Sequence, residues 1–451
     1  MKIACLLVSL LLSVCIQAQQ NRTPWSNKMV ESHGLVDFYC NTHHQDMLGT
    51  TGWDYVSGLV ANAVLKAWEA YPEKTAYYQA VKDFADFSLD EDGSFIKDPE
   101  GKSALRPSNI DDYPAGRIYF TLYKEELRKG NTKDANRYRT AATLIRNTLK
   151  YHHSRIAPGL PGSGGFFHKA IYPDQMWLDG LYMGSPIYAE WQHYFSDTTS
   201  AANQQQSWDD ITCQFKTIHQ YTYNAEAQLN YHAWSANPTD ANSFWANRNA
   251  PFLGASKEFW GRGMGWYFAA LADVLEYLPK THKDYAAVLK IYHQVAEGLS
   301  KRQDKASGVW YQLLAYNAAT RADGKGDKVA GKTFNVGTQP NYLEASCSAI
   351  FTYAYLKGIR LGLLDSKKYL PVAAKAYDGL LKTFIREKEN KTDIIQICAS
   401  AGLGPAKDPS RTGTINYYLA GKDVTITQNE GKAIGTFIMA SVEYENYLKR
   451  K

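Results

Sequence analysis

Apolar residues recur along most of the chain at the spacing of α-helices. In the stretch 284–299, DYAAVLKIYHQVAEGL, they fall on one stripe and leave a polar back, which predicts an amphipathic helix on a core. The stretch 371–384, PVAAKAYDGLLKTF, behaves alike, and Pro371 suits a first helical turn. The stretch 342–364, YLEASCSAIFTYAYLKGIRLGLL, is instead apolar nearly all round, as in a helix buried on every side.

Helices of these two kinds alternate. Six buried helices ringed by amphipathic partners predict an all-α fold, an (α/α)6 barrel formed by one domain over residues 51–451, after an N-terminal extension at 19–50. Strand signals are sparse and are expected only as short hairpins in connections, at 308–314 and 423–428. The amphipathic helices are predicted near 75–90, 133–152, 206–222, 282–300 and 367–386, and the buried ones begin near 54, 115, 177, 263, 343 and 432.

The first turns of the buried helices carry the unusual chemistry. In such a barrel the inner helices run parallel, so their first turns meet at one end, and helix N-termini attract anions. The pattern therefore predicts a site for an acidic ligand there. The segments concerned read TGWDY, NIDDYPAGR, WLDG, WGRGMGW, NYLEAS and NEGKAIG.

Composition narrows the ligand further. Among 451 residues there are 32 tyrosines and 11 tryptophans, whose flat rings suit sugar faces, although they also fill large helical cores. The net charge of +5, without a basic run, is too mild to indicate nucleic acid.

The first 18 residues, MKIACLLVSLLLSVCIQA, have the charge and apolar run of a secretory signal peptide, too short to span a membrane. We expect export, to the periplasm of a bacterium, and no later segment is apolar enough to cross a membrane. Because LSVC is an imperfect lipoprotein signal, a lipid on Cys15 is the alternative. The mature chain keeps four scattered cysteines without metal-like spacing, which leaves one disulfide or free thiols open.

Asp179 is the first candidate catalytic group. It lies in YPDQMWLDGLYMGSP among apolar residues, and it either orders a helix start or serves as an acid. Its neighbours Trp177 and Leu178 would desolvate the carboxyl and raise its pKa toward about 6–7. Asp111 and Asp112, in NIDDYPAGR, are either an N-cap with a solvated neighbour or the source of a second carboxylate.

Basic and aromatic residues suit the recognition of an acidic sugar. Arg262 lies between Trp260 and Trp266 in WGRGMGW, where its fork either clasps a carboxylate or ties a loop. Further candidates, each also compatible with a structural role, are His168, Lys169 and His232.

Several of these segments resemble one family. YPDQMWLDGLYMGSPIYAEW, YHAW, FWGRGMGWYFAALADVLEYLP and NYLEASCSAIFTYAYLKG are similar to the unsaturated uronyl hydrolases of glycoside hydrolase families 88 and 105. The match is closer to the unsaturated rhamnogalacturonyl hydrolases of family 105. It extends in the family's order from about Trp53 to NEGKAIGTFIMASVEYE, and it implies an (α/α)6 barrel.

The resemblance also implies roles for particular residues. Asp179 falls on the family's general acid/base and Asp111, rather than Asp112, on its assisting aspartate. Two departures from the family pattern, Met264 and the residues near Pro114, bear on which sugar is accepted. The substrate-binding positions implied are His168, Lys169, His232, Trp260, Arg262 and Trp266, to which we add Trp177 and Tyr55.

The implied substrate is an acidic oligosaccharide with a 4,5-unsaturated uronyl end, released by acid-catalysed hydration of the C4=C5 enol ether without a metal or cofactor. Asp111 would keep the pKa of Asp179 raised by like-charge repulsion. Two alternatives stay open: an inverting glycosidase acting on saturated glycosides, and a non-catalytic glycan-binding protein. The parent polysaccharide and the oligomeric state stay open too.

Overall fold

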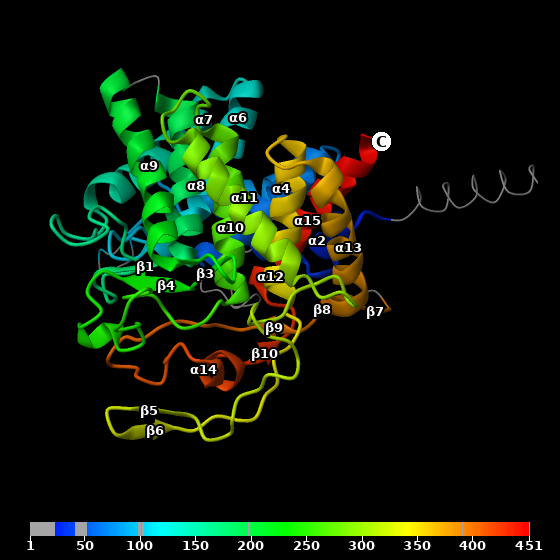
Figure 1. The fold of residues 1–451 in the computed structure, drawn as a ribbon. Helices are drawn as coiled ribbons and strands as arrows, with labels where there is room; N and C mark the ends of the chain where they lie inside the picture. The colour runs from blue at the N-terminus through cyan, green and yellow to red at the C-terminus, as the bar shows by residue number, and fades with distance from the viewer. Residues whose placement is uncertain are drawn as a thin grey trace, which may run out of the picture.

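A computed structural model describes residues 23–40, 52–97, 101, 103–196, 199–389 and 391–450 (Figure 1). The predicted signal peptide, with Cys15, lies outside the described residues.

Six inner helices form a closed ring, each packed on the next, with the last returning to the first. Most of their residues are buried on every side, as the all-round apolar sequences require. A pair of 3-10 turns, η1 and η2, leads into the second of them. The ring consists of α4 (Tyr55–Ala70), η1 (Ile110–Asp112), η2 (Pro114–Arg117) and α6 (Ile118–Arg128), α8 (Leu178–Phe195), α10 (Gly261–Tyr277), α12 (Ala345–Arg360) and α15 (Gly431–Lys449).

The outer layer is amphipathic and covers this ring (Figure 1). Its helices bury one stripe and expose the other. They are α5 (Thr75–Phe87), α7 (Thr132–Asn147, continued by the π-turn η3, Thr148–His152), α9 (Ala201–Thr222), α11 (Tyr285–Arg302) and α13 (Ser366–Phe384).

The sixth outer position is filled by the N-terminal segment. Two short helices, α2 (Trp25–Ser32) and α3 (Leu35–Cys40), pack on α15 and α5. Ser26 donates its N–H and hydroxyl to Glu445, at 3.0 and 2.6 Å. The stretch predicted as an extension therefore contributes to the barrel, and the fold is the predicted six-hairpin barrel.

In the part of the chain that the structure describes, ten short strands form five antiparallel pairs in the connections, and α14 (Ile415–Ala420) and η5 (Ala241–Ser243) lie among them. The stretch 423–428 holds one predicted strand, but 308–314 makes only isolated bridges. The pairs are β1 (Gln175–Trp177) with β4 (Ala233–Ser235), β2 (Tyr223–Asn224) with β3 (Leu229–Asn230), β5 (Asp327–Val329) with β6 (Lys332–Phe334), β7 (Ile385–Lys388) with β8 (Lys391–Ile394), and β9 (Ile397–Cys398) with β10 (Ile426–Thr427).

Close helix contact in the ring depends on small residues. A Cβ added to Gly58 of α4 would lie 2.2 Å from the Cα of Ala115 in η2, a backbone atom that cannot move aside. The backbones of the first two inner elements therefore touch at this glycine.

The end of the barrel where the inner helices finish is held by buried ion pairs. Arg117 contacts Asp273 and Glu190, both at 2.6 Å, and Lys357 contacts Asp273 at 2.6 Å. A cavity of about 360 Å³, lined mainly by charged side chains, opens beside this network. Buried charges persist only when paired in this way.

The structure also bears on the predictions about the cysteines and about membrane spans. The four cysteines of the described chain, Cys40, Cys213, Cys347 and Cys398, are all free, and the last two are buried. Within the described ranges, no helix has both the length and the apolar character needed to span a membrane.

Candidate active site

Asp179 is the second residue of α8, at the end of the barrel where the inner helices begin. Helix α8 starts without a side-chain cap, and Asp179 is 9% exposed. Within the described chain its carboxylate has one hydrogen-bond partner: Oδ2 accepts from Nε2 of His232 at 2.9 Å. Asp179 therefore makes no capping hydrogen bond, and as an acid in the first turn it contributes only its charge to the start of α8.

A strand pair brings the two residues together. Trp177 of β1 faces Ala233 of β4, and the N–H of Leu178 donates to the carbonyl of His232 at 2.9 Å. Gly263 of α10 packs beside them, and a Cβ there would lie 2.9 Å from Cδ2 of His232. One glycine of WGRGMGW is thus explained by the space that the histidine needs.

The pKa of Asp179 departs from the sequence prediction. Burial raises it, as expected, but the electrostatic interaction and hydrogen bond with His232, followed by the electrostatic interactions with His168 and Arg262, outweigh burial and hold the pKa of Asp179 below its ordinary value. The prediction of a raised pKa rested on neighbours in sequence. The decisive partner comes from another segment.

Asp111 lies in η1, facing the segment that precedes β1. Lys169 contacts its Oδ2 at 2.5 Å, and Nε2 of His168 lies 3.9 Å from Oδ1. Asn109 caps η1, while Asp112 is 1% exposed and held by Arg106 and Asn109 at 2.7 and 2.8 Å. Asp111 is thus the acid directed at the predicted binding residues. Its charge is met by Lys169, and like-charge repulsion does not set the state of Asp179.

His168 is an uncharged member of the site. Its ring stacks on Trp177 at 4.4 Å, and Trp177 stacks in turn on Tyr172 at 4.7 Å. Burial lowers the pKa of His168 to about 4, so the imidazole is neutral near pH 7. Its Nδ1 is buried without a hydrogen-bond partner among the described residues.

Arg262 is built into the wall of the site. It is 2% exposed, its Nη1 donates to the carbonyl of Cys398 at 2.5 Å and to Ser346 at 3.2 Å, and its guanidinium lies over the Trp260 ring at 4.7 Å. Burial works against its charge, yet nearby Cys398 and Glu344 raise its pKa, so it stays cationic. Both predicted functions, holding a loop and supplying positive charge, are compatible with this position.

Aromatic residues pack around Trp266, which lies one turn after Arg262 on the same helix. Trp266 of α10 is 1% exposed and packs on Tyr182 at 4.7 Å and on Tyr55 at 6.4 Å. Tyr55 itself is only partly buried. Met264, the departure from the family pattern, is buried behind the site, where its sulfur accepts the N–H of Asn230 at 3.4 Å. It acts on the segment that carries His232.

Three further side chains were not identified from the sequence. Tyr418 of α14 places its hydroxyl 2.6 Å from Nδ1 of His232. Lys432 pairs with Glu430 at the start of α15, and its ammonium lies 6.0 Å from the Tyr55 ring. The NEGK segment was a signal for the latter pair, whereas NYYLA around Tyr418 carries none.

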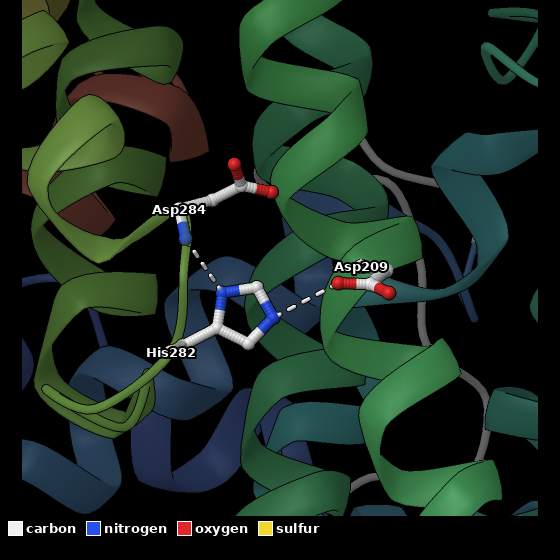
Figure 2. Close-up of side chains that lie close together, drawn as sticks. All are labelled: Asp209, His282 and Asp284. Carbon is white, nitrogen blue, oxygen red and sulfur yellow. Dashed lines mark hydrogen bonds and ion pairs between the residues drawn. The ribbon is translucent and has the colours of Figure 1, made fainter.

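A second cluster of titratable groups lies away from this site. Asp209, His282 and Asp284 come together between α9 and the start of α11 (Figure 2). His282 accepts the N–H of Asp284 at Nδ1, which puts the proton of a neutral ring on Nε2, 3.1 Å from Asp209. Lys283 and Lys216 neutralise the two acids. The hydrogen bonds describe a tether between helices, because Nε2 has no lone pair to offer a metal.

The chain matches a known family along most of its length. The sequence pattern of Glycosyl Hydrolase Family 88 matches residues 26–322 and 332–448. The chain belongs to glycosyl hydrolase family 88. It is a glycoside hydrolase, and the match begins within α2, which supports the place of that helix in the barrel.

Similar proteins agree with this assignment. A solved glycoside hydrolase of family 105 from Clostridium acetobutylicum is 34% identical, with a TM-score of 0.75 over 94% of this hydrolase and 100% of that chain. The unsaturated 3S-rhamnoglycuronyl hydrolase of Formosa agariphila is 24% identical over 55% of this chain and 57% of that protein. The unsaturated rhamnogalacturonyl hydrolase YesR of Bacillus subtilis is 24% identical over 58% and 64%.

Proposed function

We propose that this hydrolase removes the terminal 4,5-unsaturated uronic acid from oligosaccharides left by polysaccharide lyases. The observation that carries the proposal is the carboxyl of Asp179, which is directed to His232 and away from its own helix, beside cationic Arg262 and neutral His168. The activities named for the Formosa and Bacillus relatives support the same class of substrate.

The reaction needs one group that gives and then regains a proton. Protonated Asp179 transfers its proton to C4, and the electrons of the double bond leave an oxocarbenium-like charge at C5. Water adds to C5 and returns a proton to the Asp179 carboxylate. The hemiketal opens to a ketone at C5, and the hemiacetal at C1 then releases the hydroxyl of the adjoining sugar.

The lowered pKa of Asp179 makes the substrate part of the acid's activation. In the free protein the carboxylate form is favoured. A uronate carboxylate bound nearby adds a second negative charge, which raises the pKa of Asp179 and draws in the proton that C4 requires. An anionic end group is thus used for chemistry as well as for recognition.

The other residues take binding roles in this proposal. Lys169, 30% exposed and held by Asp111, and buried Arg262 supply positive charge for the uronate. Neutral His168, stacked on Trp177, lies beside these cations as a further binding residue. Trp177 and Tyr55 lie where a sugar ring would pack, while Trp260 and Trp266 shape the walls behind them.

Rhamnogalacturonan is the proposed parent polymer, by likeness to YesR, and a rhamnose-linked glucuronyl end is the second candidate, by likeness to the Formosa enzyme. Export to a bacterial periplasm, with a lipid on Cys15 as the alternative, fits degradation of polymers that enter from outside the cell. The test of this proposal is fractionation of the native host, followed by mass analysis of the mature N-terminus.

The decisive experiment follows the ultraviolet absorbance of the double bond in lyase-made oligosaccharides from several polymers. The native hydrolase should remove it, and Asp179→Asn should not. Asp174→Asn is the matched control, because Asp174 lies in the same segment at φ 56°, which asparagine also adopts.

Three outcomes separate the candidate functions. Cleavage of saturated glycosides without loss of absorbance would favour an inverting glycosidase. Undiminished oligosaccharide binding by Asp179→Asn, with no turnover by either protein, would favour a glycan-binding protein. Absorbance loss by both proteins would remove Asp179 from its proposed role.

A further inference from the structure

Tyr418 reaches the active site from α14, 186 residues beyond His232 in the chain. Its hydroxyl lies 2.6 Å from Nδ1 of His232, whose Nε2 is bonded to Asp179. We propose that Tyr418 is a positioning residue. It fixes the tautomer of His232 and thereby favours the carboxylate form of Asp179 in the free protein. The inference about catalysis rests on the proposed function, whereas the tautomer itself does not.

Proton accounting supports this role. The Tyr418 side chain is fully buried, and burial raises its pKa well above the ordinary value, so it keeps its proton. Within the described chain, His232 is the one hydrogen-bond partner of this hydroxyl. The phenol therefore donates to Nδ1, since a buried donor left unpaired is costly.

The hydrogen bond at Nδ1 determines which hydrogen bond His232 makes at Nε2. With Nδ1 accepting, a neutral His232 carries its proton on Nε2 and donates it to Asp179. That tautomer stabilises the carboxylate, the form that takes a proton from water. If Asp179 were protonated and donated to Nε2, Nδ1–H would face the Tyr418 oxygen, and the phenol proton would lose its acceptor.

Other charged or titratable groups face this chain of hydrogen bonds. His168, before β1, and Arg262, of α10, act on Asp179. Tyr417 of α14, Glu258 before α10 and Cys398 of β9 act on Tyr418. Burial raises the pKa of Glu258 to about 7, so it also titrates near neutrality. Glu258→Gln is therefore needed to assign each limb of a pH profile.

A structural role for Tyr418 is the competing explanation. Its ring stacks on Trp260 at 6.1 Å and fixes α14 over the site. Loss of that packing would change stability and overall activity. It would not exchange the protonated nitrogen of His232 or move a pH limb.

Tyr418→Phe tests the inference, with Tyr417→Phe as the matched control, because the Tyr417 hydroxyl bonds to Gly402 and Asp423 instead. In histidine-¹⁵N-labelled protein without substrate, His232 should show a protonated Nε2 and a bare Nδ1, identified by loss of its signals in His232→Gln. Tyr418→Phe should populate the opposite tautomer. It should also move the alkaline limb of kcat/KM upward by about half to one pH unit, the size of one neutral hydrogen bond.

The outcomes are distinct. A protonated Nδ1 in the native protein, whether Nε2 is bare or also protonated, would overturn the inference, even if Tyr418→Phe does not fold. An unchanged tautomer and pH limb in a folded Tyr418→Phe would overturn it equally. If the native hydrolase turns over no unsaturated oligosaccharide, the proposed function fails, while the NMR result still decides the tautomer.

Discussion

The bond between His232 and Asp179 offers the sharpest test of the proposed chemistry. His232→Leu removes the Nε2–H that lies 2.9 Å from the carboxylate while keeping a side chain of similar size. A hydrogen bond to a charged group contributes about 1.5–3 kcal/mol. Because one pKa unit corresponds to about 1.36 kcal/mol, the pKa of Asp179 should rise by about one to two units.

The direction in which the pH profile shifts follows from which protonation state of Asp179 reacts. Asp179 must be protonated to transfer a proton to C4. Activity is therefore present below the pKa of Asp179 and is lost as pH rises through it. His232 depresses that pKa, and its removal should move the alkaline limb of kcat/KM upward by about one to two pH units. Initial rates of absorbance loss across a pH series, at substrate concentrations below KM, give this limb directly.

A control variant and a stability measurement are needed to interpret the pH shift of His232→Leu. His232→Gln can still donate an amide N–H to Asp179 and should keep its limb within about half a unit of the native one. His232→Leu leaves the Tyr418 hydroxyl without its acceptor, so a loss of about 1–3 kcal/mol in unfolding free energy is expected and must be measured. A limb of folded His232→Leu at the native pH or lower would refute the reasoning.

Three further predictions follow from the same structure. The alkaline limb of kcat should lie at higher pH than that of kcat/KM, because the bound uronate raises the pKa of Asp179; coincident limbs would contradict the proposed place of the substrate carboxylate. Gly58→Ala should cost about 1–3 kcal/mol in urea unfolding through its contact with Ala115, whereas Gly337→Ala, which meets nothing within 4 Å, should stay within about 0.5 kcal/mol. Asp273→Asn should cost about 1–3 kcal/mol near neutral pH, because it leaves Arg117 with Glu190 alone and Lys357 with Glu276 alone. Since those cations lower the pKa of Asp273, its contribution to the unfolding free energy is present above pH ~4 and fades in stronger acid. An equal loss of stability on Asp273→Asn at neutral and at strongly acidic pH would contradict this account.

The helical frame was accessible from sequence because its signal is local. Inner helices were expected to begin near 177 and 343, and they begin at Leu178 and Ala345. Fully apolar segments leave few alternatives to a buried helix. The segment 25–40 was missed as an outer element, because two helices of eight and six residues give a short periodic signal.

The site was only partly predictable. Asp179 and His232 were both named, but their hydrogen bond depends on β1 pairing with β4, a contact that spacing does not reveal. The expected pKa of Asp179 was consequently wrong in direction. Tyr418 lay beyond any local argument, because a tyrosine in an amphipathic segment is more often a packing residue. Assignment of residue roles therefore relied on the family resemblance more than on the hydrophobic pattern.

The contact between α2 and α15, which we call the seam, has a consequence for how the protein unfolds. In an open stack of helical hairpins, each unit depends on its neighbours, and the end units fray first. Here the Ser26–Glu445 contact joins the first described helix to the last, so the ring offers no end hairpin from which melting can spread. Unfolding should need simultaneous rupture within the circle. Glu445→Ala would weaken the contact of α2 with α15 while α4 and α15 stay packed, and we expect a broader thermal transition, in which fraying of α2 precedes loss of the remaining hairpins.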